Sequence, residues 1–225
     1  MRKHIIFDVV GTCVSFDAYF ASIAATIGPK LSTYNITPNH FGYTWMTAAE
    51  LEFTFLSISE SYRPYKDVMR ALFYRSLFMA GVADPRSVFT DEERDACIAG
   101  YASLQLRPEL GPAFEKLRNA GFEVWCLTTG DVERGGVEMP VERVLSCDGL
   151  RVAKPALGAY RAAIGKIGAD DEKWFAAAHL WDVSAAVRAG FRGREGCWEV
   201  FDRESLEVVA DGLVEMVEGV IKISG

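Results

Sequence analysis

The chain has 225 residues, of which 50% are hydrophobic and 24% are charged, a composition typical of a globular protein with a full hydrophobic core. A net charge of −7 and a pI near 5.1 argue against nucleic-acid or anionic-membrane partners, because both bind basic patches and no Lys/Arg cluster is present. No apolar run is long enough to span a membrane, and Asp8 interrupts the first one too early for a signal peptide. We therefore expect a soluble, cytoplasmic protein.

The cysteines indicate reduced thiols. Their number is odd, they are widely scattered, and none forms a C-x-x-C pair, so neither a disulfide framework nor a zinc site is expected. The five positions are Cys13, Cys97, Cys126, Cys147 and Cys197.

The first predicted strand ends in an acid. Ile5-Ile6-Phe7 is an apolar run of the kind found in buried parallel strands, and Asp8 follows it directly. In open α/β sheets, ligands bind at the carboxyl ends of the strands, and Gly11 allows the chain to turn there. Asp8 is therefore a candidate site residue; the alternative is an ordinary Asp that begins a turn.

Residues 14–104 have a different character from the rest, with aromatic-rich helical patterns separated by proline-containing breaks. Thr90 followed by Glu93 forms a capping box, which predicts where the last of these helices begins. Leu51, Phe55 and Ile58 recur at helical spacing and are predicted to lie in the core. The patterns predict four helices, at Phe16–Ile27, Asn39–Ile58, Tyr65–Met79 and Asp91–Leu104.

From Leu106 onward, strand and helix patterns alternate, which predicts a doubly wound parallel sheet. The predicted fold class is α/β: a Rossmann-like core at residues 1–13 and 105–225, with a helical cap domain inserted at residues 14–104 over the strand ends. The expected elements are a helix from Gly111-Pro112, a strand at Phe122–Leu127, a short segment at Val141–Cys147, a helix at Leu157–Ile167, a strand at Trp174–Ala178, a helix ending at Ala189, a strand at Trp198–Phe201 and a final helix over Leu206–Ile221.

Polar side chains stand at four predicted strand ends, which converge on one crevice in such a sheet. Each has an ordinary explanation by itself, since Thr128 and Asp182 suit helix caps and Lys154 suits a solvated loop. Together they supply a carboxylate nucleophile, a cation, hydroxyl donors and a second carboxylate, the set that covalent carboxylate catalysis requires. The residues are Asp8 with Thr12, Thr128, Lys154, and His179 with Asp182.

These motifs resemble the haloacid dehalogenase superfamily, and specifically its L-2-haloacid dehalogenase (type II) branch. The similarity runs the length of the chain in four ordered motifs, and a cap segment also resembles that branch. The matching stretches are Asp8-Val9-Val10-Gly11-Thr12, Leu127-Thr128-Thr129-Gly130, Lys154-Pro155 with Tyr160, Trp181-Asp182, and Tyr43-Thr44-Trp45 in the cap.

Val10 distinguishes between the chemistries of the superfamily. Phosphatases of the superfamily that this chain resembles carry a second Asp at this position, which acts as a general acid. The fourth motif here has Asp182 but no adjacent acidic residue, so it offers few oxygen ligands for Mg²⁺. A halide leaves unprotonated and needs neither feature. We therefore expect attack on carbon rather than phosphorus, with no metal and no cofactor.

The resemblance also implies a role for each residue. Asp8 would be the nucleophile, and Asp182 would assist the water that hydrolyses the ester. His179 would position that water or the leaving group; the alternative is a hydrogen-bonded structural His. Thr12 and Lys154 would orient Asp8, while the substrate would contact Val10, Thr128, Thr129, Tyr160 and Trp181.

The sequence departs from this branch at the leaving-group end of the expected pocket. The cap Arg that the branch uses falls near Thr37. Arg63 or His40 is a candidate replacement, although the spacing requires neither, and Tyr65 and His40 are expected substrate contacts in the cap. Ala177 and Ala178 stand where the branch has two serines, and Thr128-Thr129 replaces Ser-Asn.

The sequence is therefore compatible with three functions. The first is a hydrolase that opens a carbon–heteroatom bond through an aspartyl ester, as a 2-haloacid dehalogenase does. The second is a strained-ring hydrolase such as an azetidine-2-carboxylate hydrolase, and the third is a non-catalytic binding relative. The expected partner is a small carboxylic acid substrate. Dimers are common in the family that this chain resembles, so a homodimer is one expected assembly.

Overall fold

The structure is a computed structural model that describes residues 1–129, 139–168, 170–195, 208–210 and 212–225. By internal contacts the chain divides into two compact units. One unit is formed by Met1–Val14 together with the described residues from Leu106 to the C-terminus, and the other by Ser15–Gln105.

The first unit is built on a six-stranded sheet in which all the described strand pairs are parallel. The order β5-β4-β1-β6-β7-β8 places the first strand in the middle, as a doubly wound sheet requires. The predicted α/β fold class is therefore confirmed. The strands are β1 (Lys3–Asp8), β4 (Phe122–Thr128), β5 (Val144–Ser146), β6 (Glu172–Ala177), β7 (Arg192–Glu195) and β8 (Val208–Val209).

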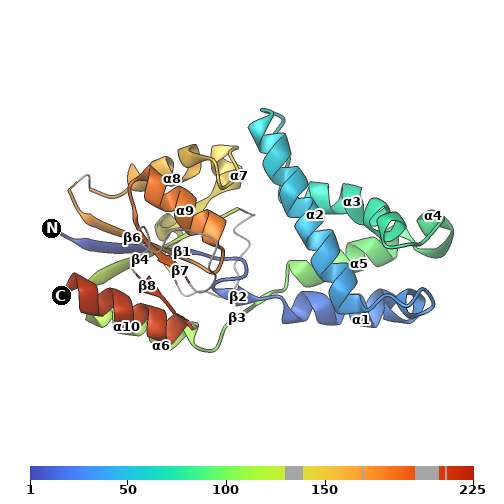
Figure 1. Cartoon of the computed structure of the whole chain (residues 1–225), viewed down its shortest axis with the longest axis horizontal. Coiled ribbons are helices and arrows are strands. Elements are labelled where there is room, and N and C mark those ends of the chain that lie inside the picture. The colour runs from blue at the N-terminus through green and yellow to red at the C-terminus, as the bar shows by residue number, and fades with distance from the viewer. Residues whose placement is uncertain (130–138, 169, 196–207, 211) are drawn as a thin grey trace. The chain divides into compact units, whose positions relative to one another are not determined.

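Helices cover both faces of this sheet, and the alternation along β1 separates two cores (Figure 1). Ile5 and Phe7 pack with α6 (Leu110–Asn119) and α10 (Leu213–Ser224). Ile6 belongs to the opposite core, with α8 (Leu157–Ile164) and α9 (Leu180–Ala189). A 3₁₀ turn (Val141–Arg143) and α7 (Cys147–Leu150) flank β5.

The C-terminal part differs from the sequence-based prediction in two places. The strand β7 has the sequence Arg-Gly-Arg-Glu, which lacks an apolar pattern, and backbone pairing with β6 defines it. Val209 was predicted in the final helix but lies in β8, which pairs with β7, and the helix begins only at Leu213 after Gly212. The strand predicted at Trp198–Phe201 lies outside the described residues.

The second unit consists of helices, as predicted. They are α1 (Asp17–Ser32), α2 (Pro38–Ile58), α3 (Tyr65–Met79), α4 (Pro85–Val88) and α5 (Asp91–Tyr101). The break predicted at Gly28-Pro29 is wrong, because α1 continues through Pro29 for another turn. Ile27 and Leu31 are fully buried on either side of the proline, and their packing offsets the hydrogen bond that proline cannot make.

The prediction that Leu51, Phe55 and Ile58 form core was also wrong, since these side chains of α2 are 52%, 59% and 69% exposed. A second apolar stripe on α2 is buried instead, at Phe41, Trp45, Ala49 and Phe53. Periodicity marked an apolar face of the helix, but only the packing of neighbouring helices determined which face is covered.

Two short strands join the units: β2 (Val14–Ser15) and β3 (Gln105–Leu106) form a two-stranded sheet of their own. Among the described helices, none combines the length and the apolar character that crossing a membrane would require.

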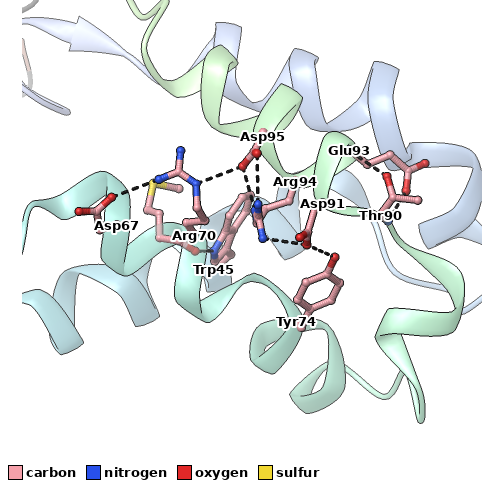
Figure 2. Close-up of polar contacts among 10 residues, drawn as sticks. Trp45, Asp67, Arg70, Tyr74, Thr90, Asp91, Glu93, Arg94 and Asp95 are labelled. Carbon is pink, nitrogen blue, oxygen red and sulfur yellow. Dashed lines mark hydrogen bonds and ion pairs between the residues drawn. The ribbon is translucent and has the colours of Figure 1, made fainter.

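We expect the capping box at the start of α5 to stabilise the helical unit. Thr90 Oγ1 accepts a hydrogen bond from the Glu93 N–H at 3.2 Å, and a Glu93 carboxylate oxygen accepts one from the Thr90 N–H at 2.9 Å (Figure 2). Thr90→Ala should lower the free energy of unfolding by about 1 kcal/mol in urea titrations. Thr90→Ser keeps the acceptor oxygen and should stay near the parent value; an equal loss in both variants would contradict a capping role.

Candidate active site

Asp8 ends the central strand and is nearly buried, with 4% of its surface exposed. Both of its carboxylate oxygens accept hydrogen bonds. The Thr12 hydroxyl donates to Oδ2 at 2.6 Å, and the Lys154 ammonium donates to Oδ1 at 2.7 Å. These two donors fix the orientation of the carboxylate in its pocket.

Lys154 bridges two acids. Its Nζ lies 2.7 Å from Asp8 Oδ1 and 2.5 Å from Asp182 Oδ2, and the residue is only 1% exposed. Burial alone would lower the pKa of Lys154, but the two carboxylates outweigh it and the pKa is raised. The ammonium therefore stays charged between the acids.

Asp182 lies in the first turn of α9 and is completely buried. Besides Lys154, the Tyr160 hydroxyl donates to its Oδ1. Burial raises the pKa of Asp182 to about 6, which Lys154 opposes and the nearby Asp8 reinforces. Asp182 therefore takes up a proton just below neutral pH. Burial and the same carboxylate also raise the pKa of Tyr160, which keeps its hydroxyl protonated.

The loop that follows Asp8 is held by its own backbone. Gly11 adopts a φ of +87°, a left-handed conformation that favours glycine. The N–H of Cys13 donates to the Val9 carbonyl at 2.8 Å, and the Cys13 thiol contacts the Asp8 carbonyl at 3.1 Å. This turn brings the Thr12 hydroxyl close to the Asp8 carboxylate.

A second strand end also fixes Thr12. The backbone N–H of Ala178, just after β6, donates to Thr12 Oγ1 at 2.9 Å. A cavity of about 550 Å³ lies beside this loop, with Gly11, Thr12, Arg107 and the first turn of α10 among its lining residues.

His179 and Trp181 stack on each other, with ring centroids 5.6 Å apart and an interplanar angle of 23°. The Lys154 Nζ lies 5.9 Å from the centre of the Trp181 ring. His179 is the N-cap residue of α9, but its side chain makes no capping hydrogen bond. Trp181 thus lies near the bridging ammonium, and His179 stacks on Trp181.

The remaining predicted residues occupy both units. Thr128 is buried at the end of β4, next to Leu127, which pairs with Asp8 in the sheet. Val10 and Thr129 are half-buried beside the same strand ends. In the helical unit, His40 is exposed in the first turn of α2, whereas Tyr65 is buried and its hydroxyl donates to the Met46 carbonyl at 3.2 Å. The substrate contacts expected of all these residues stay predictions.

Three contributors were not anticipated: the Cys13 thiol, the Ala178 N–H and the side chain of Arg107. Ala178 was noted only for the serine hydroxyl that it lacks, yet its backbone supplies a contact that no side-chain motif signals. The Arg107 guanidinium donates hydrogen bonds to the Gly11 and Thr12 carbonyls, which lie 96 and 95 positions away in the sequence, and no spacing rule connects them. Hydrogen bonds through the backbone can be found only from the structure.

The described part of the chain contains no group of three or more His, Cys, Asp or Glu side chains arranged to hold a metal ion. Its functional groups are a buried carboxylate with two donors, a shared ammonium, and a second carboxylate whose pKa lies near 6. Chemically, this set suits a carboxylate that attacks an electrophile and is later regenerated.

The sequence matches a family model described as haloacid dehalogenase-like hydrolase over residues 2–190. It is 27% identical to (S)-2-haloacid dehalogenase 4A of Burkholderia cepacia over 106 residues, and 31% identical to haloacetate dehalogenase H-2 of Moraxella sp. (strain B) over 106 residues. Each alignment covers 44% of this chain and 46% of the relative, so the match spans less than half of either protein.

Solved structures extend the similarity to the whole fold. An L-2-haloacid dehalogenase superposes with a TM-score of 0.78 at 20% identity, covering 97% of this chain and 98% of that chain. The L-2-haloacid dehalogenase of Xanthobacter autotrophicus with chloropropionic acid covalently bound gives 0.75 at 17% identity, with 98% of both chains covered. The match to the family model confirms the predicted resemblance to this superfamily, and the solved structures, each below 25% identity, show the shared fold.

Lys154→Met should reveal how much the bridge stabilises the fold. Lys154 opposes the rise in the pKa of buried Asp182, so without the ammonium that pKa would lie still further above its value in the unfolded chain, and the variant loses more stability as pH rises. We expect a loss of about 3–5 kcal/mol in urea unfolding at about pH 8, and a clearly smaller loss at about pH 5.

The matched control is Lys116→Met, which removes an exposed ion pair with Glu218 and should cost less than about 1 kcal/mol at either pH. A Lys154→Met loss of the same size at both pH values would argue against two uncompensated carboxylates.

Proposed function

We propose that this chain, which belongs to the haloacid dehalogenase-like hydrolase family, hydrolyses the carbon–halogen bond of a small 2-haloalkanoic acid through an ester on Asp8. The observation that carries the proposal is the Lys154 ammonium shared by buried Asp8 and Asp182. A nucleophile and a second carboxylate, held on one cation, provide for both the formation and the hydrolysis of an ester.

In the first step, one carboxylate oxygen of Asp8 attacks C2 of the substrate from the side opposite the halogen. The bond to carbon forms as the carbon–halogen bond breaks, halide leaves with the electron pair, and C2 is inverted. Thr12 and Lys154 hold the carboxylate in one orientation, which lowers the entropic cost of reaching the reactive geometry.

The halide departs as an anion, so this step requires no general acid. Val10, at the position that would otherwise carry a second acid two residues after Asp8, is consistent with that requirement. The proposed reaction therefore proceeds without a metal ion or a cofactor.

In the second step, water attacks the carbonyl carbon of the Asp8 ester and releases a 2-hydroxy acid. Asp182 accepts the proton of the water, because its pKa of about 6 leaves it ionised at neutral pH and close enough to that pH to exchange protons with solvent. The Lys154 ammonium, which contacts Oδ1 of Asp8 in the resting state, offsets negative charge that develops during this attack.

The names of the similar proteins support the substrate class. Both curated relatives are dehalogenases of a haloacid or of haloacetate, and a structural neighbour holds covalently bound chloropropionic acid. The cap Arg of the branch falls near Thr37 in this sequence, and Thr128 and Thr129, at and just after the end of β4, are the proposed contacts for the substrate carboxylate.

The nucleophile can be identified by isotope labelling with ¹⁸O-water. When the protein turns over excess 2-chloropropionate in ¹⁸O-water, the hydrolytic water becomes part of the Asp8 carboxylate, so the N-terminal peptide should gain ¹⁸O. Halide release should fall by at least about 10³-fold in Asp8→Asn, because an amide oxygen is a much poorer nucleophile.

The control is the same incubation without substrate, in which Asp8 should remain unlabelled. Halide release with an unlabelled Asp8 would overturn the ester mechanism. Amine formation from azetidine-2-carboxylate in place of halide release would favour a ring-opening hydrolase, and neither product would favour a binding role.

Asp182 should control the second step and its pH dependence. In the ester, Asp8 carries no charge to raise the pKa of Asp182, so protonation of Asp182 should slow ester hydrolysis only as pH falls below about 6, while ester formation persists. Asp182→Asn should trap the ester on Asp8, which intact-protein mass spectrometry detects as an added acyl group.

Glu115→Gln serves as the control, since it also removes one carboxylate from the same unit, here an exposed one on α6. It should turn over without accumulating ester. Rapid ester hydrolysis by Asp182→Asn, with an unchanged pH profile, would assign the proton transfer to another group.

A further inference from the structure

Arg107 contacts three successive carbonyl groups of the loop that follows Asp8. Its Nε donates to the Thr12 carbonyl at 3.1 Å and its Nη2 to the Gly11 carbonyl at 3.0 Å. Its backbone N–H donates to the Cys13 carbonyl at 2.9 Å. One residue from a distant part of the sequence thus binds the whole turn between Asp8 and Val14.

The direction of these hydrogen bonds determines where the opposite side of the loop points. In a trans peptide, the carbonyl and the following N–H point in opposite directions. With the Gly11 and Thr12 carbonyls turned toward the guanidinium, the N–H groups of Thr12 and Cys13 must point away from Arg107. The Cys13 N–H indeed donates to the Val9 carbonyl at 2.8 Å on the other side of the turn.

The same turn determines the position of the Thr12 hydroxyl, which donates to Asp8 and accepts from the Ala178 N–H. If the Thr12 peptide rotated, that hydroxyl would leave the carboxylate. Gly11, with its φ of +87°, has no side chain to resist such a rotation, so an external contact is needed to hold the peptide plane.

Arginine suits this task. Its planar guanidinium presents fixed donors to two carbonyls at once, these hydrogen bonds are charge-assisted, and it does not lose its proton at accessible pH. Pro108 follows directly and disfavours a helical backbone at Arg107, which helps to maintain the direction of the side chain.

We infer that Arg107 is a positioning residue for the nucleophile: it clamps the Gly11–Cys13 carbonyls so that Thr12 presents its hydroxyl to Asp8. The inference rests on the proposed function for its catalytic consequence, but the clamp itself is testable without activity. The hydrogen bonds of Arg107 go to carbonyls of the loop, so Arg107 acts on Asp8 through the loop.

The catalytic test compares Arg107→Met, Arg107→Lys and the control Arg118→Met, which removes an exposed arginine of α6 that lies over the Phe114 ring. Arg107→Met should slow single-turnover ester formation about 10- to 100-fold, because small misplacements of reacting groups have effects of that size. Arg107→Lys keeps one charged donor group, so its rate of ester formation should fall less. Arg118→Met should form the ester at the parent rate.

The effect should appear in kcat with KM nearly unchanged, and the midpoint of the pH profile should not move, because Arg107 exchanges no proton. A shifted pH midpoint or an unchanged rate of ester formation in Arg107→Met would overturn the positioning role.

A second readout does not depend on turnover. Cys13 is fully buried in the clamped loop, and Cys97 and Cys147 are buried elsewhere. Alkylation by iodoacetamide, followed by peptide mass mapping, should become at least about tenfold faster at Cys13 in Arg107→Met and remain unchanged at Cys97 and Cys147, because local opening exposes only the loop.

Equal acceleration at all three cysteines would indicate general destabilisation and would overturn the inference, as would unchanged labelling of Cys13. If the parent protein releases no halide from any 2-haloacid, the proposed function fails, and faster labelling of Cys13 alone would still support the clamp.

Discussion

The site depends on one cation placed between two acids. Two carboxylates buried this close to each other would repel strongly in an interior of low dielectric, and one would take up a proton. Lys154 removes most of that repulsion by contacting both Asp8 and Asp182. Burial is the main cause of the raised pKa of Asp182; Lys154 opposes it, and the negative charge of Asp8 adds to it.

The topology of the sheet explains how these groups meet. β1 lies between β4 and β6, so the ends of three neighbouring parallel strands bring Asp8, Thr128 and the Ala178 backbone to the same edge. The helix after β6 then presents Asp182 in its first turn, where the helix dipole favours a carboxylate. Asp8, Lys154 and Asp182 each make two polar side-chain contacts within this group.

Orientation within the site comes largely from the backbone. Val9, Gly11, Thr12 and Cys13 all contribute carbonyls to hydrogen bonds, and these contacts hold one short turn from both sides. The turn must be held rigidly because Thr12 contacts the Asp8 carboxylate through a single hydroxyl, whose position depends on the backbone of the turn. A nucleophile held this way requires little reorganisation before attack.

The sequence alone predicted the fold class and singled out Asp8, Thr12, Thr128, Lys154 and Asp182, all of which the structure buries. Apolar runs that end in polar residues, separated by helical patterns, leave few alternatives to a parallel sheet, and the order of Asp8, Lys154 and Asp182 along the chain carried the family resemblance. Tertiary structure decided what periodicity cannot encode. It covered the Phe41–Phe53 stripe of α2 instead of Leu51, Phe55 and Ile58, and it formed β7 from a polar sequence by backbone pairing. It also brought Arg107 to the nucleophile loop, because hydrogen bonds to carbonyls depend on where the chain passes and leave no signature in the residues that accept them.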